Sequence, residues 1–393
     1  MNKKIKIQEI FNEINNLSPV QHTPIVIKNI KLHIRKMKLN QPFETSFARM
    51  DMLPKIFIEI TFATKNGKEI TGIGESPFLP APWYDGEHLS GGHAILEEFI
   101  VPSLKNNVKP ITNANDFIAC YKWVVGGNIA KVGAEGAYWD FLGKLLKKPV
   151  WKLWNGTQKK VECGTSIGLE KTDSEVIEKI RISLSKKIKR IKIKIKPGRD
   201  ITLVQSIRKE FPNIPLQVDG NAAYDLQNPK HVEMLRKLDK FNLLMIEQPG
   251  PNDDIYFHSR LSTKIKTSIC LDESILHLRH AYEAVELWNK NKILDRLIIN
   301  IKPPRVGGFW EAVKIAKFCE KVGVKVWCGG MIESALGKAA NVHLSTLSGF
   351  VLPADHVSFP EYFKKDIAKS LEYKNGCLIA PNKSGWGVER IKL

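Results

Sequence analysis

Short apolar segments recur through the second half of the chain, and each of them ends in a charged residue. They cover residues 190–196, 216–219, 243–247, 269–272 and 297–302. In the first segment apolar and basic residues alternate strictly, which is the two-residue period of a β-strand. Taken alone, its lysine face is typical of a strand with one side in water. The later segments change that interpretation, because they repeat a charged ending at nearly constant spacing.

The charged residues at the segment ends are almost evenly spaced. From Lys194 through Asp219, Glu247 and Asp272 to Lys302, the successive intervals are 25, 28, 25 and 30 residues. One strand, one helix and two short loops occupy about that length. Sequences with helical periodicity lie between the segments, at 201–211, 229–238 and 310–322. The pattern therefore predicts successive β/α units, an α/β fold class and a parallel sheet.

A row of such units favours a closed barrel, with an open doubly wound sheet as the alternative. In both architectures the ligand site lies beyond the carboxyl ends of the strands. The carboxylates of Asp219, Glu247 and Asp272 all come to that edge, with lysines on either side. Like charges gathered away from water repel one another and lose hydration. The cluster therefore predicts a site for a hard divalent cation, first of all Mg²⁺, which prefers oxygen ligands.

Composition limits the classes of protein that fit. With 393 residues, the chain is long enough for a barrel of about 250 residues and a second domain. Its net charge of +19 would suit nucleic acid, but the 60 Lys and Arg residues are spread along the whole chain with no arginine-rich arm, so no specific nucleic-acid partner is expected. The sequence shows no membrane span and no secretory signal, and its six cysteines are scattered. We therefore expect a cytoplasmic protein with reduced thiols and no membrane partner.

The sequence motifs at the segment ends also resemble those of a known family. The matching stretches are Lys192-Ile193-Lys194, Gln217-Val218-Asp219, Ile246-Glu247-Gln248-Pro249, Cys270-Leu271-Asp272-Glu273-Ser274 and Asn300-Ile301-Lys302-Pro303. In this order and spacing they resemble the muconate-lactonising subgroup of the enolase superfamily, from about residue 25 to the C-terminus. The stretch 326–333 is similar to the branch that contains o-succinylbenzoate synthases and N-acylamino acid racemases.

The resemblance implies a (β/α)7β barrel of the TIM type with an N-terminal α+β capping domain. The implied parts are an N-terminal extension, the capping domain, the catalytic barrel and a C-terminal segment that packs back on the cap, at residues 1–24, 25–155, 156–355 and 356–393. The last barrel strand is expected near 347–352, and short strands of the C-terminal segment at 367–371 and 377–379. A homo-oligomer is expected.

Two cap loops, around 45–50 and 78–85, are expected to close over the barrel and to set substrate specificity. Their large apolar residues are candidates for lining a side-chain pocket, and these are Phe47, Met50, Phe78, Trp83 and Tyr84. The alternative for any one of them is a place in the cap core or on the surface.

The resemblance also implies chemistry at the carbon next to a carboxylate. Asp219, Glu247 and Asp272 are the expected ligands of Mg²⁺, or of Mn²⁺ or another divalent ion in its place. Lys194 is the predicted base, and Lys302 approaches the opposite face of the same carbon. Lys192 is predicted to tune Lys194 and to contact the substrate carboxylate. Supporting and substrate-binding positions are expected at Ser166, Asn221, Asn300, Gly330 and Met331.

Two reactions follow from this arrangement of lysines. Proton exchange by both lysines racemises an N-acylamino acid. Removal of a proton by Lys194 and its return to a leaving hydroxyl group, with Lys302 stabilising the enediolate, forms o-succinylbenzoate by syn dehydration. Dipeptide epimerase and muconate cycloisomerase are the alternatives within the superfamily, and a non-catalytic binding barrel is the alternative outside it. Each enzyme implies a small anionic carboxylate substrate.

Overall fold

A curled parallel sheet of seven strands forms the centre of the computed structural model, which describes residues 6–45, 48–359, 361–389 and 393. The spatial order is β11-β10-β9-β8-β7-β6-β5. The strands are β5 (Gly164–Ile167), β6 (Arg190–Lys194), β7 (Leu216–Asp219), β8 (Met245–Glu247), β9 (Ile269–Leu271), β10 (Leu297–Ile301) and β11 (Lys325–Cys328). The parallel register places Lys194 beside Asp219 and Asp219 beside Glu247. The predicted barrel fold is confirmed.

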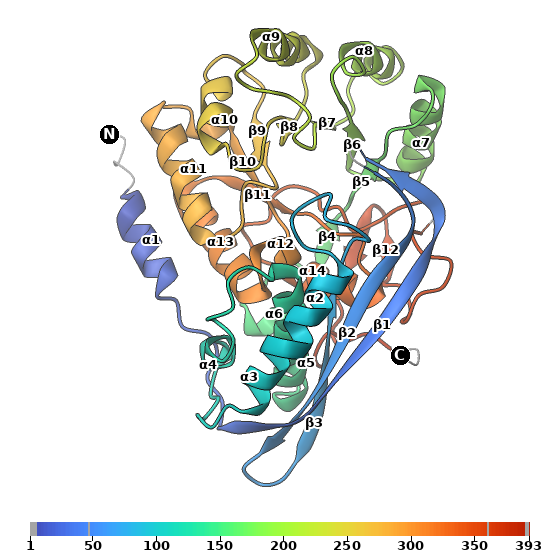
Figure 1. Ribbon diagram of the computed structural model, residues 1–393. Coiled ribbons are helices and arrows are strands. Elements are labelled where there is room, and N and C mark those ends of the chain that lie inside the picture. The colour runs from blue at the N-terminus through green and yellow to red at the C-terminus, as the bar shows by residue number, and fades with distance from the viewer. Residues whose placement is uncertain (1–5, 46–47, 360, 390–392) are drawn as a thin grey trace.

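Helices that follow the strands surround this sheet (Figure 1). They are α7 (Asp173–Ser185), α8 (Ile201–Glu210), α9 (Pro229–Lys237), α10 (Ile255–Ser262), α11 (Leu278–Lys290), α13 (Phe309–Val322) and α14 (Ala335–Leu344), with short turns at η2 (Leu238–Phe241), η3 (Leu294–Arg296) and α12 (Pro303–Val306). Local sequence fixes their ends. Thr172 and Glu175 form a capping box at the start of α7, and Gly323 ends α13 in the left-handed conformation.

An irregular segment completes the ring between the two edge strands. Phe350 makes a parallel bridge to Val326 of β11, and Ala354 makes one to Cys163, just before β5. The sequence prediction of a regular strand at 347–352 is therefore wrong in form, although the segment takes the expected place. Pro353 has no N–H group to donate to a ladder, so the segment pairs through isolated bridges.

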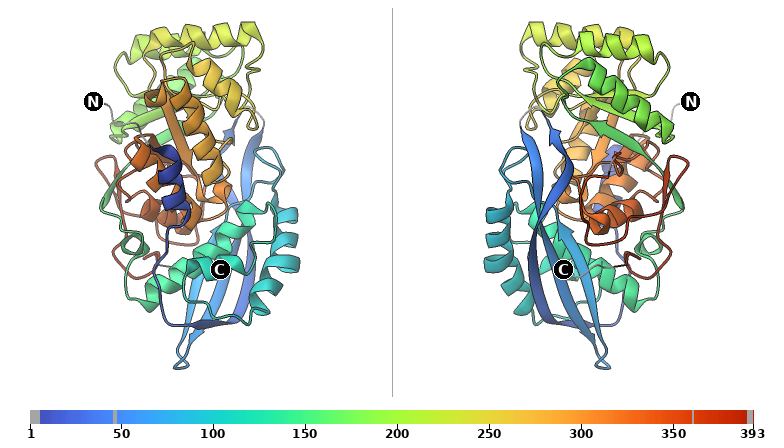
Figure 2. Two further views of the ribbon diagram at one scale, coloured as in Figure 1. Left: turned by 90° about the vertical axis from the view of Figure 1, so that its left-hand side faces the viewer. Right: turned by 90° about the vertical axis from the view of Figure 1, so that its right-hand side faces the viewer.

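The cap is an antiparallel sheet of β1 (Ile25–Glu44), β2 (Arg49–Thr64) and β3 (Glu69–Ser76), covered on one face by helices. These are α2 (Leu89–Ala94), η1 (Ile95–Ile100), α3 (Val101–Lys105), α4 (Ala114–Ala119) and the long α5 (Asn128–Leu145). Helix α5 packs closely because a Cβ on Gly72 or Gly74 would lie about 2 Å from its backbone oxygens. The long β1–β2 hairpin runs from the base of the cap to the barrel (Figure 2).

The residues before the cap form helix α1 (Ile7–Asn15), which lies on the outer helices of the barrel (Figure 1). Ile7 and Ile14 are buried there, and the ring of Phe11 lies 4.6 Å from that of Tyr282 in α11. Glu13 pairs with Lys321 of α13 at 2.5 Å. Helix α1 is thus part of the barrel surface rather than of the cap.

The C-terminal segment returns to the cap after the barrel. Strands β12 (Tyr373–Lys374) and β13 (Cys377–Ile379) form a small sheet with β4 (Lys160–Glu162), and α6 (Val150–Leu153) lies nearby in sequence. The predicted strand at 367–371 is wrong, whereas 377–379 is a strand. Trp386 is buried, and its Nε1 donates to backbone oxygens of Ile73 and Gly136 in the cap.

Candidate active site

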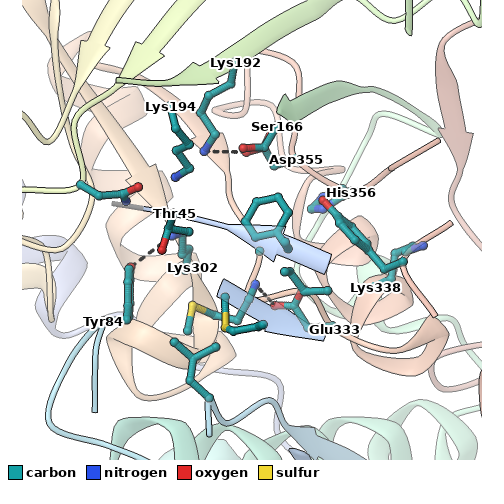
Figure 3. Close-up of a pocket in the computed structure, with 18 residues that line it drawn as sticks. Thr45, Tyr84, Ser166, Lys192, Lys194, Lys302, Glu333, Lys338, Asp355 and His356 are labelled. Carbon is teal, nitrogen blue, oxygen red and sulfur yellow. Dashed lines mark hydrogen bonds and ion pairs between the residues drawn. The ribbon is translucent and has the colours of Figure 1, made fainter. Parts of the chain in front are cut away.

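A cavity lies where the cap meets the carboxyl ends of the barrel strands (Figure 3). The cap contributes apolar side chains such as Phe43, Met50 and Leu79, and the barrel contributes lysines. The cavity therefore combines an apolar wall with a strongly basic one.

Strand β6 supplies two of these lysines from the inside of the barrel. All five residues of the strand are buried, including Lys192 and Lys194 at 4% and 7% exposure. The water-facing interpretation of this alternating strand is wrong, since both faces of a barrel strand are covered. The isoleucines pack toward the helices, and the lysines project to the barrel interior.

Each β6 lysine is paired with carboxylates. Lys194 Nζ lies 2.6 Å from Asp219 Oδ2 on the adjacent strand. Lys192 Nζ lies 2.7 Å from Asp355 and 3.1 Å from Glu247. Burial by itself lowers the pKa of Lys192, but these carboxylates outweigh it and raise the pKa well above the ordinary range. Lys192 is therefore a fixed cation between two acidic groups.

Lys302 follows the end of β10 and pairs with Asp272 at 2.7 Å. The Arg305 guanidinium also pairs with Asp272, and the Tyr84 hydroxyl donates to the same carboxylate at 2.9 Å while accepting from Lys302 at 3.1 Å. Burial raises the pKa of Asp272, but the cations of Lys302 and Arg305 more than reverse this, so the net shift is downward. A cap residue thus touches the lysine expected to act in catalysis.

Glu247 lies between these two groups, at the end of β8. Its Oε2 accepts from Gln217 at 2.5 Å, and its Oε1 accepts from Asn300 at 2.8 Å. Burial and the neighbouring Asp219 charge raise the pKa of Glu247 to about 8. The Lys192 ammonium lies 3.1 Å from this carboxylate, and its charge offsets these two effects only in part.

The lysines of β6 and β10 face each other across the barrel. Strands β7, β8 and β9, which carry or precede Asp219, Glu247 and Asp272, lie between them. Both Lys194 and Lys302 line the cavity. The structure therefore brings Lys194 and Lys302, the two lysines predicted to exchange protons with the substrate, to one cavity from opposite sides. The three carboxylates at the strand ends lie between them.

Asp219, Glu247 and Asp272 are the candidate ligands of a metal site at the strand ends. Among the described residues no group of three His, Cys, Asp or Glu side chains is arranged to hold a metal ion, since Asp219 and Asp272 point to cations. The donor chemistry nevertheless fits a hard divalent cation. Two further buried oxygens, Asn300 Oδ1 and Glu273 Oε2, have no hydrogen-bond donor among the described residues. Rotation of the lysine side chains would free carboxylate oxygens that suit Mg²⁺.

The predicted supporting residues divide into two groups. Ser166, Asn221, Gly330 and Met331 line the cavity, whereas Asn300 lies behind it and acts on Glu247. The carboxylate of Glu333 comes close to the backbone of Gly330, since a Cβ on this glycine would lie 2.8 Å from Glu333 Oε2.

Some of the candidate pocket residues of the cap loops line the cavity and others do not. Met50 and Tyr84 line the cavity. Phe78 is fully buried in the cap core, and Trp83 is 40% exposed on the surface, so neither lines the cavity. Phe47 lies outside the described residues.

Several residues at the site were not foreseen from the sequence. Arg305 follows Lys302 by three residues, and a proline-started helical turn at that point would have placed it near the same carboxylate. Asp355 lies at the end of the irregular segment that closes the ring. Because site residues lie at the ends of barrel strands, this position could have been predicted from the sequence. Lys338 and Glu333 give no such signal, because their positions depend on how the loop before α14 folds.

The family follows from comparison with known proteins. A family model described as Enolase C-terminal domain-like matches residues 175–391, more than half of the chain. The chain belongs to the enolase superfamily. This placement confirms the resemblance seen in the strand-end motifs.

Individual superfamily members match this one along nearly its full length. The o-succinylbenzoate synthase of Geobacillus kaustophilus is 38% identical, covering 93% of this chain and 94% of its own. The N-succinylamino acid racemase of Thermus thermophilus is 34% identical, with 93% and 95% covered. A solved structure of an enolase superfamily member from Listeria innocua superposes with a TM-score of 0.83 at 32% identity, covering 93% of this chain and 95% of its own. In the part of this chain that the structure describes, no helix has the length and apolar character to cross a bilayer.

Proposed function

We propose that this enolase superfamily member removes the proton from the carbon next to a carboxylate, with a divalent cation, as an o-succinylbenzoate synthase, an N-succinylamino acid racemase or both. The observation that carries the proposal is that Lys194 and Lys302 reach one cavity from opposite sides of the barrel. Two amines on opposite faces of one carbon are what proton removal and delivery require.

Asp219, Glu247 and Asp272 are proposed to hold the cation, which supplies positive charge to the substrate carboxylate as negative charge builds up on it. Lys194, as a neutral amine, takes the proton at its Nζ. Lys192 remains charged and orients the substrate carboxylate. The buried surroundings exclude water, so these charges act more strongly than they would in solution.

The fate of the proton distinguishes the two reactions. In racemisation, one lysine takes the proton and the other delivers one from the opposite face, with no net loss from the substrate. In the dehydration, Lys194 takes the proton and gives it to a hydroxyl group on the neighbouring carbon, which leaves as water while the double bond forms. Lys302 stays protonated and stabilises the enediolate by its charge.

The relatives support both activities. The relative at 38% identity is named for the dehydration, and the relative at 34% identity is named for the racemisation. A single site of this kind can serve both, because both begin with the same proton transfer.

Proton exchange in D₂O tests the proposal. We expect an N-succinylamino acid to exchange its α-proton in the presence of Mg²⁺ and to stop exchanging after treatment with EDTA, with recovery when Mg²⁺ is restored. The cyclohexadiene precursor of o-succinylbenzoate, assayed in parallel by steady-state kinetics, reports the dehydration. Exchange that survives complete metal removal would contradict the metal-dependent mechanism, and absence of both reactions would contradict the function.

A further inference from the structure

A second pocket, outside the catalytic cavity, is lined by acidic side chains. It lies between the loop before α10 and helix α11, two neighbouring helices of the outer ring (Figure 1). Its carboxylates belong to Asp253, Glu273, Glu283 and Glu286, and no lysine or arginine of the described chain lines it. The pocket is therefore a region of negative potential on a chain whose net charge is +19.

The outer carboxylates of this pocket lack counter-charges. Within the described part of the chain, Asp253, Glu283 and Glu286 form no ion pair. Glu283 and Glu286 lie three residues apart on α11, and like charges at this spacing on one helix destabilise it. A cation in the pocket would relieve this repulsion.

Glu273 lies in the wall between the acidic pocket and the catalytic cavity. It lines the pocket and is only 6% exposed, and its Oε2 has no hydrogen-bond donor among the described residues. Its Oε1 accepts from Asn221 Nδ2 at 3.1 Å, and Asn221 lines the cavity. A buried carboxylate oxygen without a partner costs stability, so Oε2 is suited to a passing cation.

The catalytic cavity presents ammonium groups to an approaching cation. Four lysines line it, and three of these pair with the candidate ligands of the metal site. None of those carboxylate ligands belongs to the described residues that line the cavity. A divalent cation that entered with the substrate would therefore meet like charge first. The acidic pocket offers opposite charge, and it ends at Glu273, the residue next to the candidate ligand Asp272.

The acidic pocket attracts a cation without chelating it. No three carboxylates or imidazoles of the described residues are arranged to hold a metal ion there. This suits a hydrated ion in transit, because Mg²⁺ gives up its water molecules reluctantly.

We propose that the divalent cation reaches the metal site through this acidic pocket, attracted by Asp253, Glu283 and Glu286 and bound in passing by Glu273 before it reaches Asp272. The inference rests on the cation of the proposed function and adds the route by which that cation arrives. Charges that steer an ion in this way raise its association rate by about 10–10³-fold at low ionic strength, and added salt removes the effect.

Binding of Mn²⁺ tests the route without any turnover. Its association rate is followed by stopped-flow quenching of tryptophan fluorescence, and its affinity by the EPR signal of the free ion. Trp327 is a suitable reporter, because Lys192 Nζ, which pairs with Glu247, lies 4.8 Å from the centre of its ring.

Three variants carry the test. Glu283→Gln with Glu286→Gln removes two charges from the rim of the pocket. Glu273→Gln removes the charge at its floor and keeps an oxygen that can accept from Asn221. Glu97→Gln with Glu98→Gln is the matched control, because it removes two charges from exposed positions on the cap.

We expect association at low ionic strength to slow by about tenfold or more in E283Q/E286Q and in E273Q, and to stay near the native rate in E97Q/E98Q. The loss in E283Q/E286Q should shrink at high salt, since the rim charges act at a distance. Retained equilibrium binding of Mn²⁺ shows that a variant is folded. Association as fast in either pocket variant as in the control overturns the inference.

Proton exchange, measured separately, keeps the proposed reaction distinct from the route. If Mn²⁺ associates with this dependence on the pocket charges but no substrate exchanges its α-proton, the proposed reaction fails and the route stands. If the native protein binds no Mn²⁺, the route is overturned together with the metal dependence of the proposed function.

Discussion

The lysines of the cavity owe their position to a barrel interior that the local sequence does not reveal. Lys192 and Lys194 are buried in a strand whose alternation is equally typical of an exposed one. Their charges are matched by Asp219, Glu247 and Asp355 at hydrogen-bonding distances. A buried lysine without these partners would be strongly disfavoured, so amines and carboxylates stabilise each other in the folded state.

Replacement of the two catalytic lysines gives the clearest residue-level prediction. Lys194→Ala and Lys302→Ala should each lower α-proton exchange by about 10²–10⁴-fold, because each removes one acid–base group. Lys196→Ala, which removes an exposed lysine two residues beyond Lys194, should leave exchange unchanged. Exchange from separate D- and L-substrates, followed by NMR in D₂O, checks this.

The same experiment separates the roles of the two faces. Each alanine variant should affect exchange from a different enantiomer most strongly, since the lysines lie on opposite sides of the carbon. Equal loss from both enantiomers in both variants would contradict the two-base arrangement.

At the scale of elements, the β/α units were predictable because each strand and its charged end follow the same local pattern. Segments near 216–219, 243–247, 269–272 and 297–302 all contain the observed strands. The closing segment around Phe350 and the false strand at 367–371 were not predictable, since they depend on pairing with distant residues. The ion pair of Asp272 with Arg305 and its hydrogen bond from the Tyr84 hydroxyl likewise form only in three dimensions, where the cap meets the barrel.

Helix α1 contributes to stability rather than to chemistry. Ile14→Ala should lower the free energy of unfolding by about 2–5 kcal/mol, because Ile14 is only 2% exposed against the barrel helices. Glu13→Ala, on the solvent side of the same helix, should change it by less than about 1 kcal/mol, since its ion pair with Lys321 is exposed. Urea unfolding measures both, and equal effects would show that the packing of α1 is not what matters.

For the whole molecule, the junction of cap and barrel is sealed by buried groups that titrate. Glu135 of α5 accepts from Trp139 Nε1 and from the backbone N–H of Trp310 in α13, both at Oε1. Burial raises its pKa from 4.5 to about 7. Between these values the folded protein binds more protons than the unfolded chain, so this group makes stability fall as pH rises through that window.

Glu135→Gln should remove this pH dependence. Glutamine keeps the accepting oxygen and carries no charge. The free energy of unfolding of the variant, relative to that of the native protein, should therefore rise by about 3 kcal/mol between pH 4.5 and pH 7.5 and change little above that. Urea unfolding at closely spaced pH values measures the difference. If the free energy of unfolding depended on pH in the same way in the two proteins, Glu135 would not be held neutral at the junction.

The course of the chain has a consequence for how a ligand reaches the cavity. The chain starts on the barrel with α1, builds the cap, returns to the barrel, and comes back to the cap with Trp386. A cap fastened at both of its ends is poorly suited to swing as a rigid lid. The hairpin that bears Met50 and the loop that bears Tyr84 bring these side chains to the cavity from outside the two attachments, so we expect short exchanges in these stretches to change the cavity lining first.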